Sequence, residues 1–375
     1  MRVVMRQMSR LLALLLLVFV VRTAFAASPT ATAPIGPINS LQPTSELGVC
    51  LALTETNGVL SVYKVRPDFE TGTTRVELAF EFSDPNHKLG RPIAADFETY
   101  SDSDRPVPAA IRDKRLLTTA DFQPTAMLAL EDGTFDITIA GEPMVIHLDS
   151  AGRVLQEPWT PTPSNFALAR RIPADQAKFV PEQGLAGIAP TDEVGVYLSF
   201  FSDVEPAPIE HGRKHSVALP AYLSVNLTKP RLNAVQSIHR LIDPATDAMR
   251  PIDGFRIDGI AAVSSTSYYL ALSKPATETS PAECVLATWH RGRTLPREGS
   301  SGFCSMPYVA GGAFYIARDL ASLVGDDAAF KRVGGLVRLD NGDLVVCNDT
   351  SDDPGAPTTL VLIRQRPSPV SALFR

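Results

Sequence analysis

The sequence lacks the short motifs that identify several classes of enzyme and metal protein. It has no G-x-S-x-G, so the nucleophile elbow of an α/β-hydrolase is not supported. It has no C-x-x-C, so neither a dithiol redox motif nor a zinc ribbon is supported. The charge is not basic either. A net formal charge of −6 disfavours binding to the phosphate backbone of nucleic acids.

Long apolar runs are also missing, with one exception at the start of the chain. Three arginines in the first ten residues precede the apolar stretch Leu11–Val21, and Ala24-Phe25-Ala26 follows it. This is the pattern of a cleavable secretory signal, and the stretch is shorter than the roughly 20 apolar residues that a spanning helix needs. We predict a signal peptide over 1–26, a secreted or periplasmic protein, and no membrane span. Removal of the signal changes the net charge to about −10.

Cysteine is scarce, and its even count fits an exported protein with disulfides. The four residues are Cys50, Cys284, Cys304 and Cys347. Cys284 and Cys304 lie in adjacent apolar segments, whereas Cys50 and Cys347 lie in the first and last strand regions. We predict pairing within each of these two sets, with free buried thiols as the alternative.

Helical periodicity is rare, and short strands dominate the sequence. The segment Val76–Phe82 places apolar residues at every second position, as a half-buried strand requires. Asp132-Gly133 and Asn341-Gly342 separate runs of β-formers and favour tight hairpin turns. Arg318–Val324 and Pro173–Lys178 are the only short helical candidates.

The strand signals continue without a visible linker, which favours one large domain. Residues 27–48 are rich in Pro, Ser, Thr and Ala and predict a flexible leader. Residues 49–365 are predicted to form one all-β domain, and 366–375 a C-terminal tail. A β-propeller fits this length better than a sandwich, because radial blades extend without one oversized core.

Histidine offers one spacing of interest. His211 and His215 have the i, i+4 spacing of paired metal ligands on a helix. The surrounding segment, 206–213, contains two prolines and a glycine and favours a loop, and no Glu follows His211 as a metalloprotease needs. His147 lies in a predicted strand, where we expect it to be packed and hydrogen-bonded.

Several ordered segments share a pattern with a known family. Residues 115–125 read RLLTTADFQPT, 131–135 read EDGTF, and 141–155 read GEPMVIHLDSAGRVL. Further along, 184–189 read GLAGIA, 257–263 read IDGIAAV, and 344–349 read LVVCND. This order resembles the esterase-like phytase family, with its "LLTGADFDIES", "DGTFW", "GFEGMA", "IGDFTAV" and "LLVLND" segments. The resemblance implies a β-propeller with a polar central channel.

The departures from that family concern its acidic residues. Carboxylates that would bind cations or handle a phosphate ester are replaced at seven positions, and hard cations need several oxygen ligands. The replaced positions are Gln123, Thr125, Ala140, Ala186, Gly259, Ser273 and Gly334. The resemblance leaves Asp121 and Asp349 as weak catalytic candidates, with Asn348 beside them and Lys274 in place of an arginine.

One loop near the end of the chain is rich in oxygen ligands. Asn348, Asp349 and Asp352 lie within five residues, as in a calcium site, although we favour the simpler explanation of solvated turn acids. We therefore expect no cofactor, with calcium as the possible exception.

The sequence leaves three functions open. We favour an exported phytase-like propeller with a degenerate active site, which binds a small-molecule or protein ligand or serves as a scaffold. The alternative is a phosphoric ester hydrolase that depends on a divalent cation. A structural surface protein is the third, and a blocked channel would indicate it.

Overall fold

The computed structural model describes residues 28–365 with internal gaps. The gaps are 57–58, 87, 89–92, 96–123, 131, 140–143, 157–158, 162–177, 180–184, 191–195, 202–203, 206–218, 225–230, 235–237, 239, 253, 265–266, 291–312, 321–331 and 354. For residues 93–95, 139, 144, 159–161, 313 and the strands between 178 and 234, the backbone alone is described. No helix long and apolar enough to cross a membrane occurs in these ranges.

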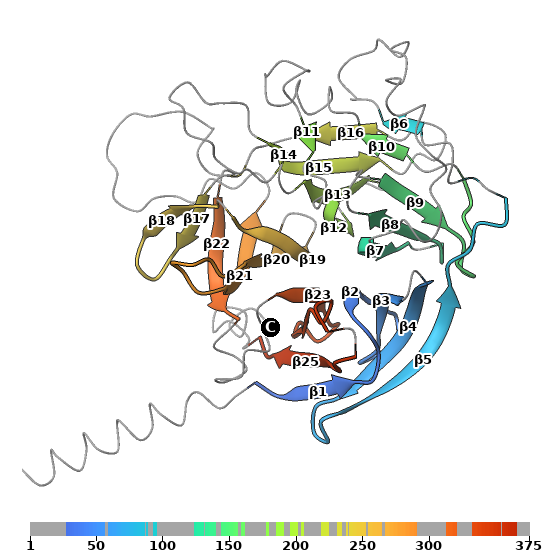
Figure 1. The fold of residues 1–375 in the computed structure, drawn as a ribbon, viewed down its shortest axis with the longest axis horizontal. Helices are drawn as coiled ribbons and strands as arrows, with labels where there is room; N and C mark the ends of the chain where they lie inside the picture. The colour runs from blue at the N-terminus through green and yellow to red at the C-terminus, as the bar shows by residue number, and fades with distance from the viewer. Residues whose placement is uncertain are drawn as a thin grey trace, which may run out of the picture.

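The described elements are all β-strands, and all but two short ones group into five blades arranged around a centre (Figure 1). Blades 1 and 5 are joined through β1 into one eight-stranded sheet. Blade 1 is a meander of four antiparallel strands. They are β2 (Ile38–Pro43), β3 (Cys50–Thr56), β4 (Val59–Asp68) and β5 (Thr73–Glu81).

Blades 2 and 3 follow in chain order. Blade 2 consists of β7 (Pro124–Ala129), β8 (Phe135–Ile139), β9 (Met144–Leu148), β10 (Trp159–Pro161) and β6 (Ile93–Ala95). Blade 3 consists of β12 (Leu185–Pro190), β13 (Val196–Phe201), β15 (Leu219–Ser224) and β16 (Arg231–Ala234). The short strands β11 (Lys178–Phe179) and β14 (Val204–Glu205) pair separately.

Blades 4 and 5 complete the circle. Blade 4 consists of β19 (Arg256–Ser264), β20 (Ser267–Lys274), β21 (Glu283–His290), β22 (Ala313–Asp319), β17 (Arg240–Asp243) and β18 (Ala248–Pro251). Blade 5 consists of β23 (Val333–Arg338), β24 (Leu344–Asn348), β25 (Thr358–Ile363) and β1 (Thr30–Ala33).

The first strand of each meander lies innermost, and these five strands form a closed ring. β2 contacts β7 and β23, β12 contacts β7 and β19, and β19 contacts β23. Five blades whose inner strands surround one axis make a five-bladed β-propeller. This architecture confirms the predicted fold class. Apolar side chains fill the spaces between blades 1 and 2, between blades 4 and 5, and between blades 5 and 1, so the described core is divided among these interfaces.

The ring is closed by the N-terminal strand. β1 pairs with β25 over four residues and meets β5 of blade 1 at Thr32, whose N–H donates to the Gly72 carbonyl at 3.0 Å. The prediction of a flexible leader over 27–48 is therefore wrong, because β1 and β2 lie inside it. The mixture of Pro, Ser and Thr in 27–48 is typical of a linker, but the segment forms short strands with buried residues such as Ala31, Ala33 and Leu41.

The predicted turns are confirmed. Gly133 and Gly342 adopt positive φ between β7 and β8 and between β23 and β24, and Gly152 does so after β9. The helical candidate at Arg318–Val324 is wrong at its start, where Arg318 and Asp319 end β22. Leu320 follows the strand as a buried bend residue, and 321–324 lie outside the described residues, as do 173–177 of the other candidate. The signal peptide and the C-terminal tail also lie outside them.

Candidate functional site

The same irregularity recurs on all five inner strands. Each inner strand has a β-bulge opposite its neighbour, close to its N-terminal end. A bulge inserts an extra residue and redirects its side chain, and bulges are frequent beside functional sites. The extra residues are Asn39, Thr125, Ala186–Gly187, Asp258 and Gly334.

Asp258 is the one carboxylate among these bulge residues. In the register of β19 and β20, Ile257 pairs with Leu272 and Gly259 with Ala271, so Asp258 has no partner across the ladder. Its side chain is 4% exposed and accepts a hydrogen bond from the Ser273 hydroxyl. The bulge therefore places a carboxyl group in the interior near the propeller axis.

Two guanidinium groups offset the negative charge of the buried Asp258 carboxylate. The Arg256 Nε atom lies 3.8 Å from Asp258 Oδ1. Burial raises the pKa of Asp258 to about 6, while Arg256, the Ser273 hydroxyl, Arg332 and the Val333 amide each favour the ionised form and limit the rise.

Arg332 also binds a second acid. Its Nη2 atom lies 3.0 Å from Asp349 Oδ2, and the Asp349 amide donates to the Arg332 carbonyl at 3.0 Å. The other Asp349 oxygen accepts the Ser351 amide at 2.8 Å. The Arg332 Nε is buried without a hydrogen-bond partner. Each carboxylate of this cluster thus has a guanidinium partner.

The space next to Asp258 is small. Ser40, Gln42, Thr125 and Gly335 are among the residues that line a cavity of about 10 Å³ there, which is room for about one water molecule. The Ser40 hydroxyl already accepts the Met127 amide at 3.1 Å. A substrate of several atoms has no room in this cavity.

The structure brings together several positions that the sequence singled out. Thr125 and Gly334 are bulge residues of inner strands, the backbone of Ala186 lies at a third bulge, and Ser273 contacts Asp258. The positions Ala140, Asp121 and Gln123 lie outside the described residues, as do His211 and His215. Lys274 lies beside the ring of Phe255 instead, with its Nζ 5.6 Å from the ring centroid.

Sequence reasoning missed Asp258. It assigned the lost acid of this strand to Gly259, one residue further on. A bulge at this point shifts the register by one residue, and periodicity cannot reveal such a shift. The available signal was the acid itself, which lies between Ile257 and Gly259 in a largely apolar strand segment.

The predicted calcium loop has its oxygens engaged within the chain. Asn348 Oδ1 accepts the Thr359 amide at 2.7 Å, and Asp349 is held by Arg332 and Ser351, whereas Asp352 is exposed in the next turn. Among the described residues, no group of three or more His, Cys, Asp or Glu side chains could hold a metal ion. The calcium site remains a prediction.

The predicted disulfide between Cys50 and Cys347 is not formed in the structure. Both residues are buried free thiols in the core between blades 1 and 5, and burial raises the pKa of Cys50 to about 12. Burial likewise raises the pKa of the Cys347 thiol. Cys284 is also a buried free thiol, and Cys304 lies outside the described residues.

His147 confirms its predicted role as a packed residue. It lies opposite Asp136 on β8 and β9, with its Nδ1 2.8 Å from Asp136 Oδ1. The two side chains are 3% and 1% exposed. Burial raises the pKa of Asp136, and contact with His147 opposes that rise.

No family model and no curated protein matches this sequence. Distant matches occur among solved structures. The β-xylosidase RS223 is 11% identical over 89% of this chain and 94% of its own, with a TM-score of 0.42. An α-L-arabinanase of Cellvibrio cellulosa, complexed with arabinohexaose, is 13% identical over 91% and 92%, with a TM-score of 0.41. The Dos1 propeller is 8% identical over 86% and 68%, with a TM-score of 0.29. Scores below 0.5 leave the propeller assignment resting on the strand pairing and the ring.

Proposed function

We propose that this chain is an exported, non-catalytic β-propeller with a degenerate, phytase-like site, and that it binds a ligand rather than transforming one. The observation that carries the proposal is the pairing of Asp258. Among the bulge residues it is the single ionisable side chain, and it is held by Arg256, Ser273 and the nearby Arg332.

Hydrolysis by acids and bases needs more than this cluster offers. In familiar carboxylate sites, two carboxylates in different protonation states flank the scissile bond, or several share a cation. Here Asp349 is tied to Arg332 and Ser351, and Asp258 faces a cavity of about 10 Å³. The arrangement fits a degenerate site in which each carboxylate is paired with a guanidinium group of the chain.

One observation favours the alternative, a phosphoric ester hydrolase that depends on a divalent cation. An acid with a pKa of about 6 near two arginines could protonate a leaving group while the guanidinium groups bind the phosphoryl oxygens. In that case Asp121 and Asp349 would contribute to the site.

Phosphate release decides between the two. The chain without residues 1–26 is assayed with p-nitrophenyl phosphate and with phytate, in calcium and in a chelator. We expect no calcium-dependent turnover above the protein-free blank. The matched variants are Asp258→Asn, Asp349→Asn and, as the control, Glu77→Gln at an exposed position of β5. Turnover that both site variants abolish and the control retains would overturn the proposal and establish the hydrolase.

A further inference from the structure

The opposite end of the channel holds a larger and mainly apolar pocket. Its volume is about 140 Å³, and it lies toward the C-terminal ends of the inner strands. Described residues of four blades contribute to it. The residues are Leu41–Pro43 from β2, Leu128 and Ala129 from β7, Ile260–Ala262 from β19, and Leu336–Arg338 from β23. Gln42, Ile260 and Leu336 line this pocket and also the small polar cavity near Asp258.

The size and lining of the pocket suit one small apolar body. A closed apolar cavity of about 150 Å³ holds a benzene molecule. Nine of the eleven lining residues are apolar, so a sugar or a peptide backbone would lose hydrogen bonds there without replacement. The exceptions are Gln42, which is 7% exposed, and Arg338.

Arg338 brings a positive charge to this pocket. It is half-buried at the end of β23, next to the Asn341–Gly342 turn. No ion pair or hydrogen bond joins its side chain to another residue in the described part of the chain. The neighbouring carboxylate of Asp343 is engaged by the Asn341 side chain and the Gln365 amide, both at 2.9 Å.

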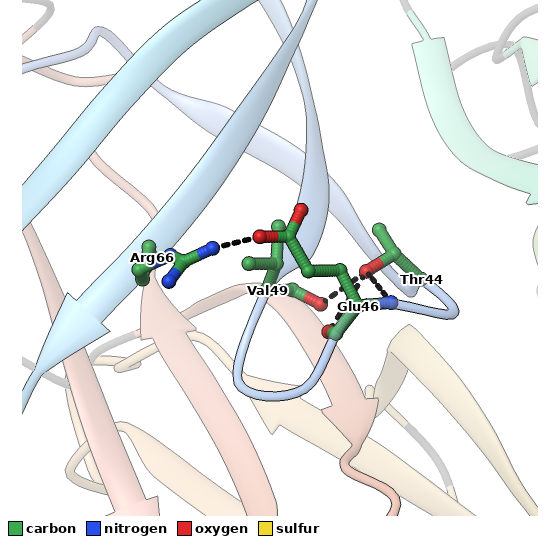
Figure 2. A network of polar contacts seen from close by, with 4 residues as sticks. All are labelled: Thr44, Glu46, Val49 and Arg66. Carbon is green, nitrogen blue, oxygen red and sulfur yellow. Dashed lines mark hydrogen bonds and ion pairs between the residues drawn. The ribbon is translucent and has the colours of Figure 1, made fainter.

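The rim beside Pro43 is fixed by a small network in the loop between β2 and β3 (Figure 2). The Thr44 hydroxyl donates to the Val49 carbonyl at 2.9 Å and accepts the Glu46 amide at 3.1 Å. The Glu46 carboxylate pairs with Arg66 on β4. A loop ordered in this way loses little further freedom when a ligand binds next to it.

We propose that this pocket binds a small carboxylate with an aromatic or branched aliphatic body, such as benzoate. The apolar body fills the space between the inner strands, and the carboxylate pairs with the Arg338 guanidinium at the rim. Arginine suits this role because its planar group donates two parallel hydrogen bonds to a carboxylate. The inference gives the binding function proposed above a ligand class and rests on it.

The test compares three small molecules, so that the contribution of the apolar body to the affinity is measured apart from that of the carboxylate charge. Binding of benzoate, benzyl alcohol and acetate to the chain without residues 1–26 is measured by ligand-observed NMR and calorimetry. We expect benzoate to bind with a Kd of about 1 mM or tighter. Benzyl alcohol should bind at least about tenfold more weakly, because it lacks the charge-assisted hydrogen bonds. Acetate should not bind detectably.

Two arginine variants identify the site. Arg338→Gln should weaken benzoate at least about tenfold and leave benzyl alcohol unchanged. Arg318→Gln, a substitution at an exposed position of β22, should leave both affinities unchanged. Thermal unfolding of each variant shows that it is folded. Absence of benzoate binding, equal binding of acetate, or benzoate binding unaffected by Arg338→Gln would each overturn the proposal. Phosphate release tests the non-catalytic function separately, so the two failures are distinguishable.

Discussion

At the scale of single residues, Asp258 shows how burial and charge oppose each other. Removal from water raises its pKa from 3.8 to about 6, although Arg256 and Arg332 are close. The folded protein therefore binds this proton more tightly than the unfolded chain does. Its contribution to stability is complete at low pH and is lost as the pH rises toward 6 and above.

The first prediction follows from this shift. Between about pH 4 and 7, the free energy of unfolding of the wild type should fall relative to that of Asp258→Asn, by up to about 3 kcal/mol. Urea unfolding of both proteins at each pH measures the difference. A difference that stays constant with pH would show that Asp258 titrates as it does in the unfolded chain.

The second prediction concerns the buried pair Asp136 and His147. Removing one partner leaves the other buried without its hydrogen bond, which typically costs about 3–5 kcal/mol when the pair is charged. Asp136→Ala should therefore lower the free energy of unfolding strongly. Asp352→Ala, an exposed control, should change it by less than about 0.5 kcal/mol. Similar small effects of both substitutions would contradict the buried pair.

At the scale of elements, the bulges let the inner strands of neighbouring blades approach closely. Gly334, the bulge residue of β23, lies so near blade 1 that a Cβ atom there would overlap the Ile38 carbonyl oxygen. The same atom would lie 3.0 Å from the Asn348 carbonyl oxygen. Glycine is needed at this position because backbone, not a movable side chain, occupies the space.

The third prediction tests this contact. Gly334→Ala should destabilise the protein by at least about 2 kcal/mol, since the strands must separate to admit a methyl group. Gly355→Ala is the matched control, because its Cβ would meet only the Asp353 carboxylate at an ordinary 3.7 Å. Thermal and urea unfolding measure both. A wild-type stability for Gly334→Ala would mean that β2 and β23 are further apart than described.

At the scale of the whole molecule, stability depends on closing the ring. Blade 5 takes its outer strand, β1, from the start of the chain and its other three from the end. β1 also meets β5 of blade 1, so the two ends of the domain are joined at the edge as well as at the inner ring. An unclosed sheet would expose unpaired backbone groups of β25.

The fourth prediction is that β1 is indispensable and the segment before it is not. Deletion of residues 1–34, which removes β1, should lower the midpoint of thermal unfolding well below that of the chain lacking 1–26. Faster cleavage by a protease should accompany the loss, because an open blade 5 unfolds locally more often. Equal midpoints would show that β1 does not close the ring.

The sequence alone predicted much of the fold through local patterns. Alternating apolar residues in Val76–Phe82 and the Asp132-Gly133 and Asn341-Gly342 turns indicated an all-β protein, and the long succession of strands favoured a propeller. These features are local, because strand alternation and positive φ depend on residues close in sequence. The ordered resemblance further selected Thr125, Ala186, Ser273 and Gly334, which the structure places at or beside the bulges.

The tertiary structure alone decided what no local pattern contains. Residues 30–43 read as a leader because their composition is that of a linker, and their pairing partners lie at the other end of the chain and in blade 1. Sequence reasoning placed a lost acid at Gly259 and overlooked Asp258 beside it. A bulge shifts the register here by one residue, and the hydrophobic periodicity does not reveal that shift. Ser273 contacts Asp258 within the β19–β20 hairpin, but Arg332 and the four blades around the apolar pocket meet only when the ring closes. The sequence thus determined the strands and turns, and the closure of the ring determined which side chains became neighbours.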